Sequence, residues 1–320
     1  MPFKTPSFWY KSANWQALLL SPLSALYAVG HKLNVSFQKP YKSNVPVICI
    51  GNIVMGGSGK TPTVLALLDL ITEQNIAKNP VILTRGYGGS TTKATIVDPA
   101  IHTYHDVGDE ALLLVKHAQV IVSPDRKEGA QKAEEIGADL ILMDDGLQNN
   151  TLYKDINLLV VDGANPFGNG FVFPAGPLRE PKSCALKRCD AVISINEQVN
   201  LDKILFSANI QSDSTHLDAD KNYVAFAGLG RPEKFKTTLE DLGFKISCWH
   251  PFADHHPYTK EDLEDLDTHA VKHNATLITT SKDHVRLPDP YQHTTQVLPI
   301  TLSFDNSAAL ASFLKERLYS

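Results

Sequence analysis

A glycine-rich loop between an apolar run and a helical pattern constrains this chain more than any other feature. Residues 47–50 form a short apolar run typical of a strand, and residues 61–73 repeat apolar side chains at helical spacing. A loop of this composition lets backbone N–H groups converge on phosphate oxygens, where side chains would obstruct them. The residues predicted to surround the phosphates of a nucleoside triphosphate are Gly56, Gly57, Ser58, Gly59, Lys60 and Thr61.

The last two residues of the loop suit the charges of a bound nucleotide and its metal ion. Lys60 can reach the β- and γ-phosphates, and the Thr61 hydroxyl can bind Mg²⁺. The helix that begins near Thr61 adds the positive end of its dipole. Residue 54 is valine, although the general pattern GxxxxGK[ST] has glycine there. The alternative is an ordinary glycine-rich turn, but such a turn has no need of a Lys-Thr pair.

Strands alternate with helices along most of the chain. The expected strands of the first unit are residues 47–50, 80–83, 120–122, 140–143, 156–161 and 191–195. This alternation predicts an α/β fold with a parallel, P-loop NTPase-like sheet and helices on both faces. The polar stretch 196–220 is the expected join to a smaller α/β unit. We therefore expect an amino-terminal segment (1–42), a nucleotide-binding domain (43–220) and a C-terminal domain (221–320).

Two aspartates follow the apolar run 140–143. A buried parallel strand would deliver Asp144 and Asp145 to the carboxyl edge of the sheet, where ligands of open α/β sheets bind. One aspartate would hold magnesium, directly or through water. The alternative is a pair of loop aspartates that cap a helix, which the neighbouring phosphate loop makes less attractive.

Two further clusters carry groups able to move a proton. Asp109 and Glu110 precede a helical pattern, so they could cap that helix, or they could supply a base and a magnesium ligand. Asp254, His255 and His256 lie together, but neighbouring histidines point in different directions, so only one can easily serve a site. Nothing nearby supplies softer ligands, and a zinc site is therefore not expected at this cluster.

Arginines stand in two loops shaped by glycine and proline. Arg85 lies in the run Thr-Arg-Gly-Tyr-Gly-Gly, and Arg179 follows Pro-Ala-Gly-Pro-Leu. Rigid loops that present arginine suit the recognition of phosphate, and surface turns are the alternative.

The amino-terminal segment has the pattern of a helix that lies on a membrane. No charged residue occurs between Lys11 and His31, and one helical face is apolar. That face consists of Trp15, Leu18, Leu19, Leu23, Leu26 and Tyr27. Interspersed polar residues disfavour a membrane span. The absence of a small-residue cleavage site disfavours a secretory signal. The flanking lysines, Lys11 and Lys32, favour an interfacial helix over one docked on the protein's own core.

Charge and cysteine content narrow the class of protein. The formal net charge is −5 and the pI is about 6.2, which argues against a nucleic-acid partner, and no obligate protein partner is evident. None of the four cysteines forms a CxxC pair, and Cys49 and Cys248 lie in apolar runs typical of small buried hydrophobic residues. A reducing compartment is therefore expected, without disulfides or a zinc framework.

Taken together, these segments resemble the tetraacyldisaccharide 4′-kinase family, the lipid A 4′-kinases of lipopolysaccharide biosynthesis. The resemblance extends from the amino-terminal helix nearly to the carboxyl end, and the family also lacks a glycine at the position of Val54. Further matching residues are 85–89, 108–110, 123–124, 126, 144–148, 167–170, 174–180, 227–228, 253–255, 280 and 282–283.

The resemblance implies an ATP- and Mg²⁺-dependent kinase that phosphorylates the 4′-hydroxyl of a tetraacylated glucosamine disaccharide 1-phosphate. It implies a monotopic enzyme on the cytoplasmic face of the bacterial inner membrane, with an amphiphilic substrate and a C-terminal domain that contributes to the active site. The implied catalytic residues are Asp109, His255 and Lys60. The implied magnesium-associated residues are Thr61, Glu110 and Asp144. The implied substrate contacts are Asp145, Gln148, Arg85, Arg126 and Arg179.

Two positions depart from the family pattern. Asn149 stands where the family usually has histidine, so no ionic headgroup contact is expected there. Ser281 stands where the family usually has glutamate. The alternative function is a regulatory or maturation ATPase that uses the same loop as a switch and has no lipid acceptor.

Overall fold

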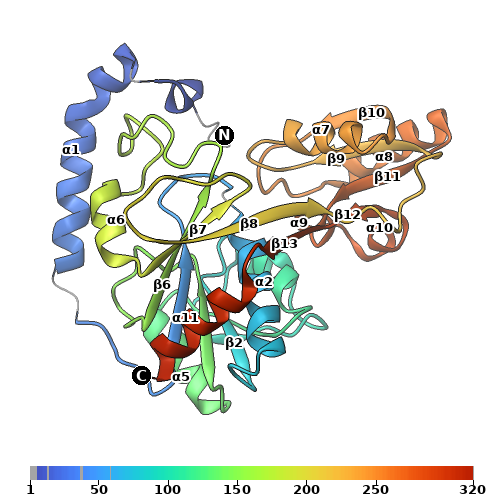
Figure 1. Ribbon diagram of the computed structural model, residues 1–320. Coiled ribbons are helices and arrows are strands. Elements are labelled where there is room, and N and C mark those ends of the chain that lie inside the picture. The colour runs from blue at the N-terminus through green and yellow to red at the C-terminus, as the bar shows by residue number, and fades with distance from the viewer. Residues whose placement is uncertain (1–5, 13, 37–38, 58, 320) are drawn as a thin grey trace.

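The elements build two sheets of unequal size. The computed structural model describes residues 6–12, 14–36, 39–57 and 59–319, and of residues 31–36 it describes the backbone alone. Figure 1 shows the larger sheet surrounded by helices and the smaller sheet to one side of it. Ser58, predicted to contact phosphate, and the side chain of Lys32 lie outside the described residues.

The larger sheet is mostly parallel and has the strand order β13-β8-β7-β6-β1-β5-β2-β4-β3. Its strands are β1 (Val47–Gly51), β2 (Pro80–Thr84), β3 (Thr95–Ile96), β4 (Gln119–Val122), β5 (Leu140–Asp144), β6 (Ile156–Asp162), β7 (Ala191–Ile195), β8 (Ile204–Ser212) and β13 (Ile300–Phe304). At the two edges, β13 pairs with β8 and β3 with β4 in antiparallel fashion. The expected parallel sheet is therefore confirmed at its centre and wrong at its edges.

Helices cover both faces of this sheet. Along β1, Ile48 and Ile50 face the core that α2, α4 and α11 close, whereas Val47 and Cys49 face the core that α5 and α6 close. These helices are α2 (Lys60–Glu73), α4 (Asp109–Leu114), α5 (Arg126–Glu135), α6 (Lys182–Arg188) and α11 (Ser307–Tyr319), and the short α3 (Tyr104–Val107) precedes α4. Since strand side chains alternate between faces, a strand covered on both sides must be apolar throughout.

The smaller sheet is parallel and has the order β10-β9-β11-β12. Its strands are β9 (Asn222–Ala227), β10 (Lys245–Pro251), β11 (Ala275–Thr280) and β12 (Gln296–Leu298). Helix α7 (Glu233–Asp241) packs on one face through Phe235 and Leu239, and α8 (Lys260–His273) packs on the other through Leu263 and Leu266. The short helices α9 (Ser281–His284) and α10 (Asp289–Thr294) follow β11.

The last part of the chain returns to the larger sheet. Strand β13 pairs with β8 from Ile300 to Phe304, and Leu310 and Leu314 of α11 are buried in the core beside α2. The sequence-based assignment of residues 221–320 to one C-terminal domain is therefore wrong at its carboxyl end. The pairing with β8 and the burial of α11 fix these residues on the nucleotide-binding sheet.

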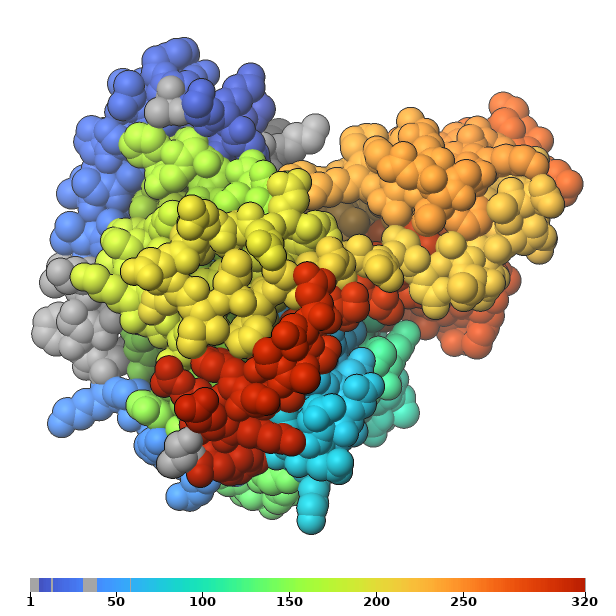
Figure 2. Space-filling view, viewed as in Figure 1, coloured from blue at the N-terminus to red at the C-terminus, as the bar shows by residue number. Residues whose placement is uncertain are grey.

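A helical segment at the amino terminus packs on a long loop of the larger unit. Trp9, in the 3₁₀ helix η1 (Ser7–Tyr10), is 1% exposed and donates its indole N–H to the carbonyl oxygen of Pro174. In α1 (Trp15–Ser36), the Ser24 hydroxyl donates to the carbonyl oxygen of Val172 and accepts the N–H of Ala175. Figure 2 shows α1 in blue at the margin of the molecule, against the light-green segment that includes this loop.

The face of α1 turned away from the loop is apolar and open. Its large side chains, each more than half exposed, are Trp15, Leu18, Leu19, Leu23, Leu26 and Val29. Among the described residues, no helix combines the length and apolar character needed to cross a membrane. The small side chains Ala17 and Ser24 face the protein, so docking on the chain leaves most of the predicted apolar face uncovered, and only Tyr27 of that face packs on the loop, against Phe173.

Candidate active site

The phosphate loop joins the central strand β1 to the amino terminus of α2. Gly56 and Gly59 have φ angles of 117° and 77°, a left-handed region that side-chain-bearing residues rarely adopt. A Cβ at Gly57 would meet nothing within 4 Å, so the loop leaves open space at that position. Gly59 caps α2 without any side-chain hydrogen bond, and the first-turn N–H groups of α2 therefore have no side-chain acceptor at the cap.

The valine that departs from the general loop pattern has a structural reason. Val54 forms an isolated antiparallel bridge with Leu178, and its φ is not in the left-handed region. The neighbouring N–H of Met55 donates to Pro177 O, and Arg179 N–H donates to Ile53 O. The first part of the loop is thus extended backbone, which needs no glycine, and it holds the segment that carries Arg179.

Asp144 lies at the end of β5, directly beside the phosphate loop. In the parallel register, Ile50 of β1 is opposite Asp144. The Asp144 side chain is 1% exposed, and its Oδ1 has no hydrogen-bond partner among the described residues. Burial, with the negative charges of Glu110 and Asp145, raises the pKa of Asp144 to about 7 despite the opposing charge of Lys60. A buried carboxylate beside other carboxylates and without a donor fits a site for a divalent cation.

Asp145 joins Lys60 to Arg179. Both of its carboxylate oxygens accept hydrogen bonds from Arg179 Nη1, at 2.9 and 3.0 Å, and Lys60 Nζ lies 3.7 Å from Oδ2. Burial acts to raise the pKa of Asp145, but the charges of Lys60 and Arg179 outweigh it and hold this pKa below its usual value. The backbone φ of Asp145 is 50°, a left-handed conformation that turns its carboxylate back towards the loop lysine.

The two other arginines predicted to contact substrate lie in contrasting environments. Arg126 is 3% exposed and donates to the carbonyl oxygens of Ser123, at 2.7 Å, and Asp144, at 3.5 Å. It therefore supports the end of β5 from behind. Arg85 is exposed, and Tyr87 from the same loop packs its ring 5.5 Å from the ring of His255. The loop thus contributes an aromatic contact that its sequence motif did not predict.

Gln148 and Asn149 stabilise the chain that follows the aspartate pair. The Gln148 amide donates to Asn52 O and to Glu180 Oε1, and it thus ties the phosphate-loop strand to the Arg179 segment. Asn149 Oδ1 accepts the backbone N–H groups of residues 151 and 152, which is a turn stabilised by a side chain. The asparagine that departs from the family pattern at position 149 thus stabilises a turn.

Asp109 begins α4 on the same side of the sheet. Gly108 before it has φ 85°, and a Cβ there would lie 2.5 Å from the carbonyl oxygen of Tyr87. This close approach buries Asp109 to 3% exposure, with one carboxylate oxygen accepting the N–H of Glu110. Glu110 Oε1 lies 3.7 Å from Lys282 Nζ. The predicted base and a predicted metal ligand are therefore adjacent, and the second is paired with a residue of the smaller unit.

His255 reaches Asp109 from the smaller unit. Its Nδ1 lies 2.9 Å from Asp109 Oδ2, and its Nε2 lies 3.1 Å from Lys282 Nζ. A lysine ammonium can only donate, so Nε2 accepts and the proton of the neutral ring is on Nδ1, where it donates to Asp109. Burial acts to raise the pKa of Asp109, but the His255 hydrogen bond and the charge of Lys282 outweigh it and lower this pKa.

A buried network holds the loop that carries His255. Asp283, fully buried, accepts the Gly228 N–H, the Tyr258 hydroxyl and Arg286 Nη2 at 2.8, 2.7 and 2.6 Å. Arg286 also donates to His256 O, and its Nε lies 3.6 Å from Asp109 Oδ2. These residues were not assigned roles from the sequence, although the run Lys-Asp at 282–283 is part of the family resemblance.

The neighbouring histidine is turned elsewhere. His256 Nε2 lies 2.9 Å from Asp262 Oδ2, and its ring stacks on Phe252 with centroids 4.7 Å apart. His255 and His256 thus face different partners, as expected for adjacent histidines. The charged groups form a continuous series from Lys60 through Asp145, Asp144 and Glu110 to the Asp109–His255 pair, which is an arrangement suited to phosphoryl transfer.

Comparisons with known proteins agree with this arrangement. Residues 16–319 match the profile of the family described as tetraacyldisaccharide-1-P 4′-kinase. The chain is 42% identical to the tetraacyldisaccharide 4′-kinase of Bradyrhizobium sp. (strain BTAi1), over 99% of this chain and 96% of that protein. It is 42% identical to the enzyme of the same name from Paramagnetospirillum magneticum, over 96% of each.

A solved structure shares the fold over most of its length. The crystal structure of LpxK from Aquifex aeolicus in complex with ATP is similar with a TM-score of 0.78 and 27% identity. The similarity covers 95% of this chain and 99% of that one. The profile match and the near-full-length relatives show that the chain belongs to the tetraacyldisaccharide-1-P 4′-kinase family.

Proposed function

We propose that the site transfers the γ-phosphoryl group of ATP to the 4′-hydroxyl of a tetraacylated glucosamine disaccharide 1-phosphate, a step of lipid A biosynthesis. The names of the relatives supply the acceptor class, and the solved LpxK supplies the nucleotide. The observation that carries the proposal is the buried Asp109–His255 pair, which is linked through Glu110 to Asp144 beside the phosphate loop. A switch ATPase has no use for a carboxylate–imidazole pair supplied by a second unit.

Asp109 is the group that accepts the proton of the sugar hydroxyl. A positioned general base accelerates such a step roughly 10²- to 10⁴-fold. Its lowered pKa makes it a weak base, but phosphoryl transfer passes through a loose transition state in which little proton transfer is needed early. His255, with its proton on Nδ1, holds the carboxylate in place and stabilises its charge, and Lys282 fixes that tautomer.

Lys60 and the phosphate loop bind the transferred group. Preorganised N–H groups and an ammonium are most effective where charge develops in a site that excludes water. Asp145 keeps the Lys60 side chain near the loop through an ion pair of 3.7 Å, and Arg179 offers a second guanidinium for phosphate. Nucleotide phosphates would replace Asp145 as the partner of Lys60.

The acidic residues fit a magnesium ion. Asp144, Glu110 and the Thr61 hydroxyl would hold it, and bound there it would neutralise charge on the nucleotide phosphates. The support is the buried Asp144 Oδ1, which has no hydrogen-bond partner among the described residues. Without a cation, burial and two neighbouring carboxylates hold the pKa of Asp144 near neutrality.

The exposed face of α1 is the proposed membrane contact. A row of large apolar side chains, more than half exposed on one helix, indicates a membrane or a partner surface. An acceptor with four acyl chains resides in a bilayer, so an interfacial helix would bring the site to its substrate. We place the enzyme on the cytoplasmic face of the bacterial inner membrane, bound to one leaflet.

Transfer of labelled γ-phosphate tests the function directly. ATP turnover is measured with and without the disaccharide lipid in mixed micelles, and the label is followed into the lipid. We expect turnover to require the acceptor and the label to appear on it. Asp109→Ala with parent-like thermal melting is the matched control, which should bind ATP but not label the lipid. Equal hydrolysis with and without acceptor, and no labelled lipid, would support the ATPase alternative.

A further inference from the structure

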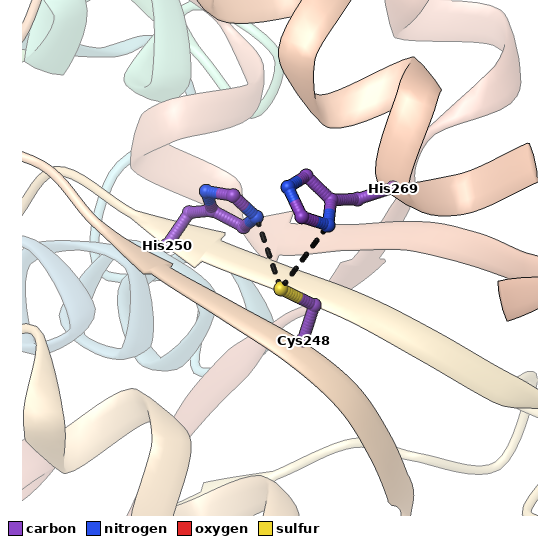
Figure 3. A group of neighbouring side chains, drawn as sticks. All are labelled: Cys248, His250 and His269. Carbon is purple, nitrogen blue, oxygen red and sulfur yellow. Dashed lines mark hydrogen bonds between the residues drawn. The ribbon is translucent and has the colours of Figure 1, made fainter. Parts of the chain in front are cut away.

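Cys248, His250 and His269 converge on the smaller sheet, outside the site described above. Cys248 Sγ lies 3.2 Å from His250 Nε2 and 3.6 Å from His269 Nδ1 (Figure 3). Within the described part of the chain, this is the group of three metal-ligating side chains whose donor atoms all lie within 4.8 Å of one another. Cys248 and His250 are two residues apart on β10 and so share a face, and α8, which carries His269, covers that face.

The two sulfur–nitrogen distances are close to those around a tetrahedral zinc ion. Zinc binds thiolate sulfur at about 2.3 Å and imidazole nitrogen at about 2.0–2.1 Å, so sulfur and nitrogen on one ion are roughly 3.5 Å apart. The two sulfur–nitrogen distances, 3.2 and 3.6 Å, bracket this value. The two imidazoles come from different elements and meet edge to face with ring centroids 4.8 Å apart. The donor atoms of the two rings lie within 4.8 Å of each other, so the rings would have to close on a shared ion.

A carboxylate lies behind both imidazoles. Asp265 has one oxygen 3.7 Å from His250 Nδ1 and the other 3.8 Å from His269 Nε2. These are the ring nitrogens turned away from the sulfur. Metal-bound histidines almost always direct their second ring nitrogen to a carboxylate, a carbonyl or water, which fixes the tautomer and strengthens the ligand. At these distances Asp265 makes no hydrogen bond to either ring, but its carboxylate lies on the side of both rings from which such a contact to metal-bound imidazoles would be made.

The chemistry of the donors selects a thiophilic divalent ion. One thiolate with two imidazoles suits zinc, whereas magnesium and calcium require oxygen ligands. The acidic site at Asp144 has only oxygen donors, which suit magnesium better than they suit a thiophilic ion.

We infer that Cys248, His250 and His269 bind one Zn²⁺, with a water molecule as fourth ligand. Binding converts the Cys248 thiol to a thiolate and releases its proton to solvent, while both imidazoles bind as neutral rings. The ion joins β10 to α8, the two elements connected by the loop of residues 252–259 that carries His255. Zinc would therefore tie together the two elements that flank the loop presenting His255 to Asp109.

Cobalt(II) in place of zinc tests the site on the full-length protein. After chelation, the protein is titrated with Co²⁺ and then with Zn²⁺, and absorption is recorded. We expect a sulfur-to-cobalt charge-transfer band that saturates at one equivalent and is displaced by Zn²⁺. Cys248→Ser should lose the band, and His269→Ala should weaken Co²⁺ binding at least tenfold. The exposed Cys184, outside the cluster, provides the matched control Cys184→Ser, which should keep the band.

The Asp265→Asn variant distinguishes a metal site from a simple hydrogen bond between the thiol and the imidazoles. The variant keeps all three donors, so the band should remain while Zn²⁺ affinity falls about 10–100-fold. Circular dichroism establishes that each variant is folded, and zinc should raise the melting temperature of the parent but not of Cys248→Ser. Absence of the band in the folded parent, or its persistence in Cys248→Ser, would overturn the inference.

Discussion

Replacing Asp144 by asparagine should stabilise the metal-free protein at alkaline pH and abolish magnesium binding. The carboxyl group is buried at 1% exposure beside Glu110 and Asp145, and one of its oxygens lacks a donor among the described residues. Ionising it in the folded protein is therefore costly. Asparagine has the same shape and no charge, so it removes this cost together with the proposed metal ligand.

The magnitude of the stability change and its pH dependence follow from the pKa of Asp144. The pKa of Asp144 is about 7 in the folded protein against 3.8 for an unperturbed group, and one unit corresponds to about 1.36 kcal/mol. Since the folded state holds the proton more tightly, the parent loses stability as pH rises from about 4 to about 7, by up to about 4 kcal/mol. Roughly 2–3 kcal/mol of this loss falls between pH 5 and pH 8. The buried asparagine amide of the variant, if it lacks hydrogen-bond partners, costs about 1–3 kcal/mol of stability at every pH. This cost therefore does not alter the change in relative stability between pH 5 and pH 8.

Urea unfolding followed by far-ultraviolet circular dichroism, at pH 5 and pH 8 without divalent ions, measures this difference. The stability of Asp144→Asn relative to the parent should improve between the two pH values. Asp145→Asn is the control: the pKa of Asp145 is lowered by Lys60 and Arg179, so its carboxylate is charged in both the folded and the unfolded state at pH 5 and at pH 8, and this variant should be less stable than the parent by a similar amount at both pH values. A relative stability of Asp144→Asn that does not change with pH would refute the raised pKa and the reasoning about the metal.

Three further perturbations test the other parts of the site. Lys60→Ala should lower turnover by at least about 10² with an unchanged melting temperature, since an ammonium at the transferred group stabilises the transition state; normal turnover would remove Lys60 from the mechanism. Asp109→Ala and His255→Ala should each lower kcat strongly with little change in the KM for ATP, and the double variant should be little worse than the poorer single one. In that assay His256→Ala should be mild, and fully additive losses would break the pair. Leu19→Asp should reduce flotation with anionic vesicles while turnover on a soluble acceptor analogue is kept; undiminished flotation would exclude α1 as the membrane contact.

The centre of the larger sheet could be predicted from the sequence because its strands are apolar on both faces. The six apolar runs predicted as strands are β1, β2, β4, β5, β6 and β7. Strand β8 was missed inside the stretch taken for a linker. It buries Phe206 and Ala208 between polar residues, since it lies near the edge of the sheet with one face partly open. Its antiparallel partner β13 comes from the far end of the chain, and a pairing of that sequence separation leaves no local pattern.

The residues of the site were foreseen where a motif names them, but their partners were not. Arg126, which the resemblance implied as a substrate contact, is buried behind Asp144 at the start of α5, because a matching motif does not reveal which way a side chain faces. Lys282, which fixes the tautomer of His255, lies 27 residues from it along the chain. Cys248 packs partly buried against the core of the smaller sheet, as its apolar run indicates, and its contact with His269 was not evident because that residue comes from a helix 21 residues away.

Two residues of the site have a backbone conformation that favours glycine. Asp145 and His255 have φ angles of 50° and 56°, in the left-handed region where residues with a side chain are about 1–2 kcal/mol less stable. Glycine would relieve this strain, but it would remove the carboxylate that holds Lys60 and the imidazole that holds Asp109. The surrounding structure therefore has to impose the conformation, through Arg179 for Asp145 and through the Gly228 carbonyl oxygen, which accepts the His255 N–H. Local rules favour glycine at both positions, and the exception occurs where a side chain is needed for the reaction.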